Sequence, residues 1–211
     1  WLPEADGRVL AYDGKRWRTY GEKEGVTRNT WLVAVDVTGH VWALGDGIST
    51  AEQGDARWVD HSLLVGVEAN SRVTDIVADG AGGVWLSFVG PGRLGGAVTR
   101  MEAGTERWTS HRYSLNAAIP RQVYGLEYDE EGTLWVWGEE AIAFRRPEQR
   151  WQRIALPALQ AQAVVRDRQG RFWIGTEHGI WSAAPDGQDI RGPLLVPAPP
   201  IGGRVNALAI Y

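Results

Sequence analysis

Short apolar segments recur along the chain, and a turn containing aspartate and glycine follows most of them. The segments span residues 30–35, 73–78, 123–128, 161–166 and 205–211. Each of the first four is followed by an aspartate and, three positions later, by a glycine. Apolar runs of this length that are bounded by turn residues are typical of β-strands. The pattern therefore predicts an all-β chain of many short strands.

These turns belong to a longer motif, Asp-x-x-Gly-x-apolar-Trp, that occurs four times. An aspartate can accept hydrogen bonds from its own turn and a glycine can adopt a positive φ, so the motif predicts a tight turn between two strands. One aspartate per repeat could also suggest calcium ligands, but equivalent turns would spread the carboxylates around the molecule instead of converging them on one ion. We therefore expect turn capping. The copies are Asp36/Gly39/Trp42, Asp79/Gly82/Trp85, Asp129/Gly132/Trp135 and Asp167/Gly170/Trp173.

A second motif, Arg-Trp, alternates with the first and ends at Trp17, Trp58, Trp108 and Trp151. Trp1 lies as far before Trp17 as Trp42 lies before Trp58, so Trp1 is a fifth tryptophan of the first kind. In this scheme the apolar segment is the first strand of a repeat, the first motif carries the second, and Arg-Trp opens the fourth. Third strands are expected at residues 7–12, 141–144 and 179–183. A degenerate fourth strand is expected at 194–196, among several prolines.

Four short strands in a repeat of about 40–45 residues are the signature of a β-propeller blade. The sequence therefore predicts a single domain over residues 1–211, made of four-stranded antiparallel blades. The blades are expected at 1–29 joined by 205–211, and at 30–70, 71–120, 121–160 and 161–204. Because the chain starts in a second strand and stops in a first strand, its termini would complete one blade and close a five-bladed ring. The alternative is part of a larger propeller, for example one with seven blades.

The chain has 12 tryptophans and only 3 phenylalanines. The second-strand tryptophans (Trp1, Trp42, Trp85, Trp135, Trp173) and the fourth-strand tryptophans (Trp17, Trp58, Trp108, Trp151) account for nine of them. A large side chain that recurs once per blade is expected to pack between neighbouring blades. The remaining three, Trp31, Trp137 and Trp181, are candidates for an exposed aromatic platform.

The composition excludes several kinds of chemistry. A net charge of −4 does not suggest a nucleic-acid partner, and the absence of cysteine excludes disulfides and thiolate metal sites. No apolar stretch is long enough to span a membrane, so we expect no membrane insertion. The four histidines lack metal-ligand spacing, and two of them, His61 and His111, share a repeat position with Tyr20 and Ile154. We therefore expect those two to be structural.

No motif of a nucleophile or phosphate site is present either. The glycine-rich residues 90–96 lack a following lysine and are expected to be a loop between a second and a third strand. His178 with Glu177 or Glu139 is the nearest approach to an acid–base pair. The sequence therefore predicts no enzyme activity, no metal and no cofactor.

Polar residues before the first strands, and residues able to hydrogen-bond two positions later, suggest a binding site. If the first strands are innermost, these residues ring the mouth of a central channel, where propellers commonly place ligands. Two arginines in the set favour an anionic partner. The predicted site consists of Asn29, Trp31, Arg72, Gln122, Tyr124, Gln160, Arg204 and Asn206.

The fourth motif copy reads Asp-Arg-Gln-Gly-Arg-Phe-Trp-Ile-Gly-Thr-Glu-His-Gly-Ile over residues 167–180. This stretch resembles the two-component regulator propeller repeat; the other copies share its Asp, Gly and Trp but lack Gly-Thr. The resemblance implies a propeller fold and an extracytoplasmic sensor region of a bacterial signalling protein, periplasmic or extracellular. It carries over no fixed catalytic residues. No signal peptide opens the sequence at Trp1, so we expect a mature or trimmed product.

The leading interpretation is a non-catalytic module that binds a small molecule, a glycan or a protein. A lectin-like propeller is the first alternative, but it would repeat exposed aromatics at equivalent positions, which Trp31, Trp137 and Trp181 do not do. A propeller lyase or hydrolase is the second. A structural subunit of a larger assembly is the third, and an apolar surface patch would favour it.

Overall fold

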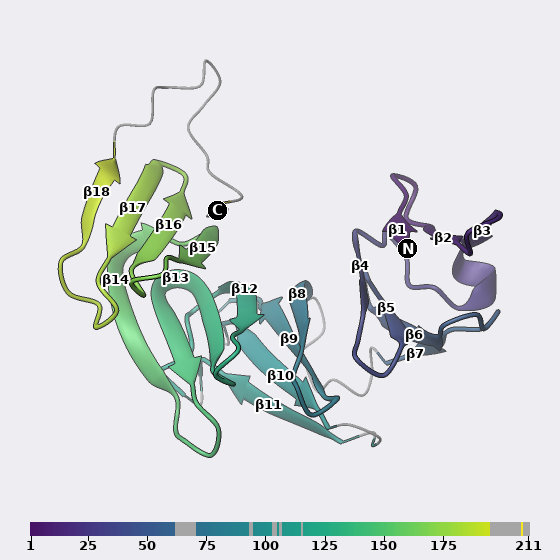
Figure 1. Cartoon of the computed structure of the whole chain (residues 1–211), viewed down its shortest axis with the longest axis horizontal. Coiled ribbons are helices and arrows are strands. Elements are labelled where there is room, and N and C mark those ends of the chain that lie inside the picture. Colours follow the sequence, from purple (N-terminus) through teal and green to yellow (C-terminus); the bar gives the residue numbers. More distant parts are fainter. Residues whose placement is uncertain are drawn as a thin grey trace. The chain divides into compact units, whose positions relative to one another are not determined.

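The computed structural model describes residues 1–61, 71–92, 95–102, 105, 107–114, 116–194 and 208. Within these residues the chain forms strands β1 to β18 and one short 3₁₀-helix, η1 (Glu22–Glu24) (Figure 1). In every pairing whose register is defined, consecutive strands run antiparallel, and each sheet follows the order of the sequence. This is the meander of short strands that the repeat predicts.

The described strands make up five sheets. The first contains β1 (Leu2–Pro3), β2 (Val9–Tyr12) and β3 (Trp17–Tyr20). The second contains β4 (Leu32–Val35), β5 (His40–Leu44), β6 (Ile48–Glu52) and β7 (Val59–Asp60). The third contains β8 (Arg72–Ala78), β9 (Val84–Val89), β10 (Ala97–Met101) and β11 (Trp108–Arg112). The fourth contains β12 (Val123–Tyr128), β13 (Leu134–Arg145) and β14 (Gln152–Gln160). The fifth contains β15 (Ala163–Arg166), β16 (Phe172–Thr176), β17 (Gly179–Ala183) and β18 (Arg191–Leu194).

The long strand β13 combines the expected second and third strands of its repeat. Its first half pairs with β12 and its second half with β14. Nine steps of extended chain would separate Trp135 from Phe144 by about 30 Å. Their rings instead stack with centroids 4.7 Å apart. The strand therefore folds back on itself near Glu140, whose φ is +61°. The fourth sheet thus has the same four-strand order as the second, third and fifth sheets.

The chain divides into two compact units. Unit 1 comprises Trp1–Pro91 and Val98–Ser110, and unit 2 comprises Gly92–Ala97 and His111–Tyr211. The prediction of a single domain over 1–211 is not tested. The strand expected to close the ring, 205–211, lies outside the described residues apart from Leu208, so ring closure and the number of blades also stay predictions.

The Asp-x-x-Gly-x-apolar-Trp motif forms the predicted capped turn in all four copies. One carboxylate oxygen of the aspartate accepts hydrogen bonds from the backbone N–H groups two and four residues later, at 2.7–3.1 Å. The glycine takes a φ between +78° and +90°, a conformation that residues with a Cβ rarely adopt. The turn is thus defined by two residue types that repeat in the sequence.

The same aspartate also fixes the tryptophan of its motif. Its second oxygen accepts the indole N–H of Trp42, Trp135 or Trp173 at 2.7–2.9 Å. In the remaining copy, Asp79 instead accepts hydrogen bonds from Arg100, whose guanidinium lies 5.9 Å from the ring centre of Trp85. Each aspartate therefore ties the orientation of a large ring to the turn before it.

Hydrogen bonds lower the carboxyl pKa of two of the turn aspartates, Asp36 and Asp167. Burial alone would raise the pKa of Asp36, but hydrogen bonds from Thr38, Trp42 and the His40 backbone outweigh it and lower the pKa below its ordinary value. The indole N–H of Trp173 is the main cause that lowers the pKa of Asp167. Lowered carboxyl pKa values stabilise the folded state above about pH 4, and this contribution is lost as the pH falls through the folded-state pKa.

In unit 1, fourth-strand tryptophans pack against aromatic rings of the preceding sheet. Trp58 of the second sheet meets Trp1 and Tyr20 of the first, each with ring centroids 6.1 Å apart. Trp108 of the third sheet meets Trp42 and His61 of the second, each at 6.3 Å. We name this arrangement the inter-sheet joint. In it, a fourth-strand tryptophan contacts two rings of the preceding sheet. One ring is that sheet's second-strand tryptophan, and the other belongs to the residue three positions after that sheet's fourth-strand tryptophan.

Unit 2 contains part of the same arrangement. The ring of Trp151 lies 5.5 Å from that of His111, edge to face. Burial lowers the pKa of His111, and the charge of Arg145 lowers it further. The histidine is therefore neutral in the folded protein at neutral pH, and acidification that protonates it opposes folding. The expectation that His61 and His111 are structural is confirmed by these ring contacts.

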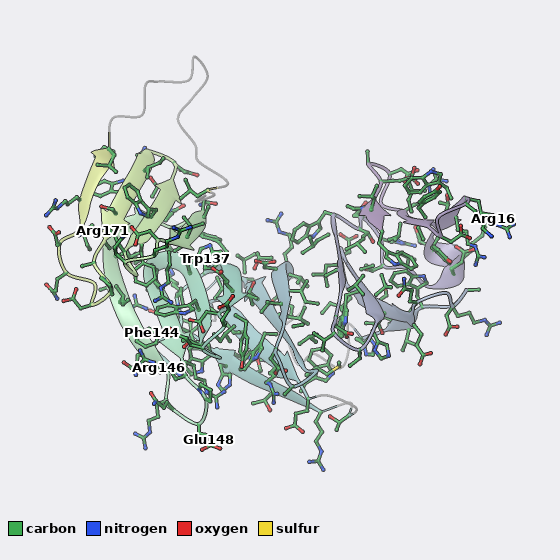
Figure 2. All side chains as sticks on the ribbon, viewed as in Figure 1. Arg16, Trp137, Phe144, Arg146, Glu148 and Arg171 are labelled. Carbon is green, nitrogen blue, oxygen red and sulfur yellow. The ribbon has the colours of Figure 1, made fainter. Side chains whose placement is uncertain are left out.

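Between the fourth and fifth sheets the joint has a different composition. Trp135 lies between Phe144 and Phe172, at 4.7 and 5.2 Å, and the guanidinium of Arg166 stands 4.5 Å from its ring centre. Phe144 and the Arg146 that covers it are labelled in Figure 2. Residues Ile142, Ile154, Leu156, Phe172 and Ile174 fill the core beneath them.

Three expectations about tryptophans require correction. Trp17 is 56% exposed, although its repeat position predicts burial. Trp137 and Trp181 are half-buried and pack against the core of unit 2, so they form no exposed platform. Each lies over a glycine of the same sheet, Gly125 and Gly192 respectively, where a Cβ would overlap the indole. Trp31 alone of the three candidates is exposed.

We predict that Trp58→Ala lowers the free energy of unfolding by about 3–5 kcal/mol, because its buried ring fills a joint. Trp17→Ala, at the same repeat position, is the matched control and should change stability by less than about 0.5 kcal/mol, because its ring is largely in solvent. Urea denaturation followed by circular dichroism measures both. Equal losses of unfolding free energy in the two variants would contradict the role of the inter-sheet joint in stability.

Candidate functional site

The predicted site residues lie at one end of their respective sheets. In an antiparallel sheet the start of one strand lies beside the end of the next, so the loops before first strands meet the loops after second strands. Unit 1 holds Asn29, Trp31 and Arg72, and unit 2 holds Gln122, Tyr124 and Gln160. Arg204 and Asn206 lie outside the described residues.

Asn29 connects three loops of unit 1. Its backbone is left-handed, with φ of +51°, and its side-chain amide donates to Asp46 at 2.8 Å. Gly7, in the loop between β1 and β2, approaches so closely that a Cβ there would lie 2.9 Å from the Asn29 backbone. Asn29 is thereby held between the β1–β2 loop and the β5–β6 turn.

Gly45 allows the segment that leads into β4 to pack closely against the end of β5. Asp46 donates its N–H to the Arg28 carbonyl at 2.8 Å, and Trp31 donates to Leu44 at 2.9 Å. A Cβ at Gly45 would overlap the Arg28 carbonyl. Gly138 stands in the same relation to the Gln122 carbonyl in the fourth sheet. Glycine at the end of a second strand therefore sets how closely the incoming first strand can approach.

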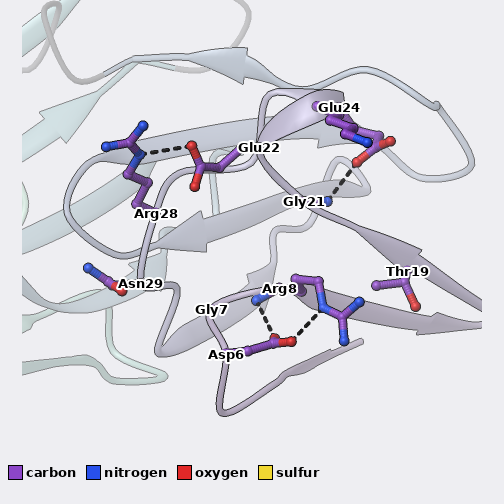
Figure 3. A pocket seen from close by; sticks show the side chains of 10 residues that line it. Asp6, Gly7, Arg8, Thr19, Gly21, Glu22, Glu24, Arg28 and Asn29 are labelled. Atoms are coloured by element: carbon purple, nitrogen blue, oxygen red, sulfur yellow. Dashed lines mark hydrogen bonds and ion pairs between the residues drawn. The ribbon is translucent and has the colours of Figure 1, made fainter.

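A pocket of about 540 Å³ lies beside Asn29, between the β1–β2 loop and the loop that contains η1 (Figure 3). Its walls carry three acidic and three basic side chains. The lining residues are Asp6, Gly7, Arg8, Thr19, Gly21, Glu22, Lys23, Glu24, Arg28 and Asn29. Six charged groups around one space indicate a polar occupant instead of an apolar one.

Most of these charges hold one another in place, as the dashed lines in Figure 3 show. Arg8 pairs with Asp6 at 2.7 Å, and Arg28 with Glu22 at 2.8 Å. The carboxylate of Glu24 accepts the N–H of Gly21 at 2.7 Å. Among the described residues, Lys23 has no hydrogen-bond or ion-pair partner. A ligand would therefore meet one free ammonium and two oriented guanidinium groups.

The Glu22–Arg28 ion pair also lines a second pocket, of about 410 Å³. The hydrogen bond and charge of Glu22 raise the pKa of Arg28 above its ordinary value, so the guanidinium stays charged. Thr27, Asp46, Ser49 and other residues around the β5–β6 turn complete this second space. The Glu22–Arg28 ion pair thus lines both polar pockets of unit 1.

Two of the three predicted residues of unit 2, Gln122 and Gln160, lie beside Glu139. Gln122 accepts the N–H of Glu139 at 3.0 Å, and Gln160 is its register partner across β13 and β14. Arg121 lies 3.7 Å from the Glu139 carboxylate. Gln160 was expected at the start of a first strand, but β14 extends through it, so it ends a fourth strand instead. Tyr124 lies within β12, one residue into the strand.

Arg72 and the acid–base candidates remain separate from these clusters. Arg72 opens β8, is exposed and pairs with Val89. His178 and Glu177 are both exposed in the β16–β17 turn, while Glu139 belongs to the fourth sheet. No group of three or more histidine, aspartate or glutamate side chains in the described part of the chain could hold a metal ion.

Among the residues that line the larger pocket, only Asn29 was predicted from the sequence. Except for Thr19 in β3, the others occupy loops whose lengths and residues differ from repeat to repeat, so the alignment of repeats carries no signal for them. The run Gly-Glu-Lys-Glu-Gly at 21–25 was the available cue, since three consecutive charged residues between glycines form a short capped turn.

A sequence profile described as "Two component regulator propeller" matches residues 155–178. The match covers the motif copy that begins at Asp167, and it confirms the resemblance of this copy to that repeat. No curated protein matches the chain.

Solved structures share the fold. Two extracellular domains of proposed hybrid two component systems from B. thetaiotaomicron superpose with TM-scores of 0.64 and 0.62, at 16% and 17% identity. The alignments cover 98% and 88% of this chain but only 30% and 27% of those chains. Virginiamycin B lyase from Staphylococcus aureus superposes with a TM-score of 0.67 at 12% identity, over 91% of this chain and 64% of that one. Identities this low show the fold alone: the chain is all-β, built from the antiparallel blades of a β-propeller.

No helix in the described part of the chain has the length and apolar character needed to cross a membrane.

We predict that Gly45→Ala lowers the free energy of unfolding by about 1–3 kcal/mol, because the added methyl group displaces the Arg28 carbonyl. Gly80→Ala is the control: a Cβ there meets nothing within 4 Å, and stability should stay within about 0.5 kcal/mol of the parent. Urea unfolding compares the two. An unchanged midpoint for Gly45→Ala would show that the approach of this loop does not limit the site.

Proposed function

We propose that this chain is a non-catalytic ligand-binding module of an extracytoplasmic bacterial sensor or scaffold, and that the pocket beside Asn29 takes the ligand. The observation that carries the proposal is the charged lining of the pocket, whose side chains are already oriented by ion pairs. Groups held in place before binding lose little conformational freedom when a ligand arrives. The extracellular sensor domains that share the fold support the compartment and the role.

Binding is favoured over catalysis by what lines the pocket. It contains no histidine, and its carboxylates are engaged with arginine or backbone N–H groups. General acid–base catalysis needs a group whose pKa lies near the working pH within reach of the reacting atom. The exposed His178 and Glu177 have no third group that orients them among their described neighbours. The lyases with this fold are similar in architecture alone.

The lining suggests a polar ligand with hydrogen-bond acceptors or a negative group. Free N–H donors of Lys23, Arg8 and Arg28 suit carboxylates, phosphates or sugar hydroxyls. A lectin with one site per blade would need the same exposed aromatic in several sheets. Trp31 is the one platform candidate that is exposed, so a repeated sugar site is not supported.

A thermal-shift panel of sugars, sugar acids, amino acids and dicarboxylates tests the proposal on the whole chain. A ligand at 100 times its Kd should stabilise the protein by about 2.7 kcal/mol and raise the Tm. Lys23→Glu should abolish the shift, because it replaces the free ammonium of the pocket with a carboxylate.

Lys15→Glu is the matched control, since Lys15 is the other lysine of the chain and lies in the β2–β3 turn outside the pocket. The shift should persist in this variant. A ligand that binds equally well to the Lys23→Glu variant would place the site elsewhere. Conversion of the ligand, followed by NMR, would contradict a non-catalytic role.

A further inference from the structure

The Glu22–Arg28 ion pair at the edge of the larger pocket keeps hydrogen-bonding atoms of both kinds open to a ligand. The pair forms between Arg28 Nε and one carboxylate oxygen of Glu22, 2.8 Å apart (Figure 3). Among the described residues, the Nη1 and Nη2 groups of Arg28 and the second oxygen of Glu22 make no other hydrogen bond. The side chains of Arg28 and Glu22 are 72% and 62% exposed, so a ligand can reach these atoms. The ion pair thus presents a forked donor and an acceptor side by side.

The other ion pair in the lining, Arg8 with Asp6, lacks this opening on its acidic side. One oxygen of Asp6 accepts the backbone N–H of Arg8 at 3.2 Å, and the other lies 2.7 Å from the Arg8 guanidinium. Both oxygens of this carboxylate are therefore engaged already. The Glu22–Arg28 pair is the ion pair of the lining that can offer a donor and an acceptor to the same ligand.

The backbone on both sides of this ion pair is fixed. Glu22 opens η1, and the Trp58 N–H donates to the carbonyl of Glu24, the last residue of η1, at 2.7 Å. The carbonyl of Arg28 accepts the N–H of Asp46 at 2.8 Å. A ligand therefore meets two charged groups whose places are set before it binds, which limits the conformational entropy that binding costs.

The balance of charge in the lining disfavours a simple ion as the ligand. The acidic and basic side chains of the pocket are equal in number, so their charges nearly cancel. An anion bound to the fork of Arg28 would lie beside the carboxylate of Glu22, and a cation bound to Glu22 would lie beside the guanidinium; each would be repelled by the second partner. A molecule with a positive and a negative group on neighbouring atoms is attracted by both partners at once. The ion pair therefore selects for a zwitterion.

We propose that the pocket beside Asn29 recognises a free α-amino acid, with Arg28 donating to its carboxylate and Glu22 accepting hydrogen bonds from its ammonium group. This inference rests on the proposed function, because it names the ligand class of the same site. An α-amino acid carries both charges on one carbon atom, so both groups fit beside a single ion pair. The pocket volume of about 540 Å³ lies in the range of small-molecule sites and leaves room for the ligand's side chain.

Isothermal titration calorimetry of the whole chain with the standard L-amino acids at neutral pH tests the proposal. At least one of them should bind. Its N-acetyl derivative lacks the ammonium group, and its carboxamide lacks the carboxylate. Each derivative should bind at least about tenfold more weakly, because it loses hydrogen bonds between charged groups.

The Glu22→Gln variant assigns the ammonium contact to its residue. It should weaken binding of the amino acid at least about tenfold, but it should leave the affinity for the N-acetyl derivative unchanged or higher. Glu52→Gln is the matched control, because it makes the same exchange at an exposed glutamate of β6 outside the pocket. The control should bind the amino acid like the parent, and circular dichroism verifies that both variants are folded.

The remaining outcomes decide against the proposal and separate it from the proposed function. Succinate or inorganic phosphate might bind instead, lose affinity in Lys23→Glu and gain affinity in Glu22→Gln; this result would overturn the amino-acid assignment and leave the pocket as the binding site. Amino-acid binding that is unchanged in both Glu22→Gln and Arg28→Gln would also overturn the assignment. If no probe, sugars included, binds in a manner that depends on Lys23, the proposed function fails together with this inference.

Discussion

The packing of an indole ring from one sheet against the aromatic face of the sheet before it is the interaction on which the rest of this structure depends. A four-stranded sheet of such short strands has too little core to be stable alone. Burial of one tryptophan removes about 200 Å² from water and contributes on the order of 5 kcal/mol as an upper estimate. The turn aspartates support this packing, because their carboxylates accept the indole N–H groups of Trp42, Trp135 and Trp173 and so orient these rings. The hydrogen bonds of the turns and the packing between sheets therefore depend on each other through the same tryptophan side chains.

Much of the fold follows from three residue types at fixed spacing, and the exceptions have identifiable physical causes. Asp, Gly and Trp locate the turn and the two strands that flank it, as the match between residues 123–128 and β12 shows. The repeat pattern does not show whether another sheet covers a given tryptophan. It therefore predicts burial for Trp17, whose side chain is exposed in the structure. Trp137 and Trp181 are half-buried because they pack over glycines, Gly125 and Gly192 respectively, and these pairings depend on register, which the repeat alone does not show.

The candidate site was less predictable than the fold, because it is built from the loops in which the repeats differ. Alignment of the chain's own repeats identified Asn29, because this residue precedes a first strand. The charges that give the pocket its character come from two loops, 4–8 and 21–29, and the corresponding loops of the other described sheets carry different residues. Gln160 was misplaced because β14 runs on into the expected connection. The invariant scaffold thus fixes where loops emerge, and the variable loops determine what they can bind.

A double-mutant cycle on Trp42 and Trp108 tests the central claim most directly. The two rings lie 6.3 Å apart at an interplanar angle of 83° and belong to different sheets. If the joint holds the sheets together, Trp42→Leu and Trp108→Leu should each destabilise the protein, and their effects should be coupled by about 0.5–1.5 kcal/mol. Additive effects, with no coupling beyond about 0.3 kcal/mol, would contradict the account.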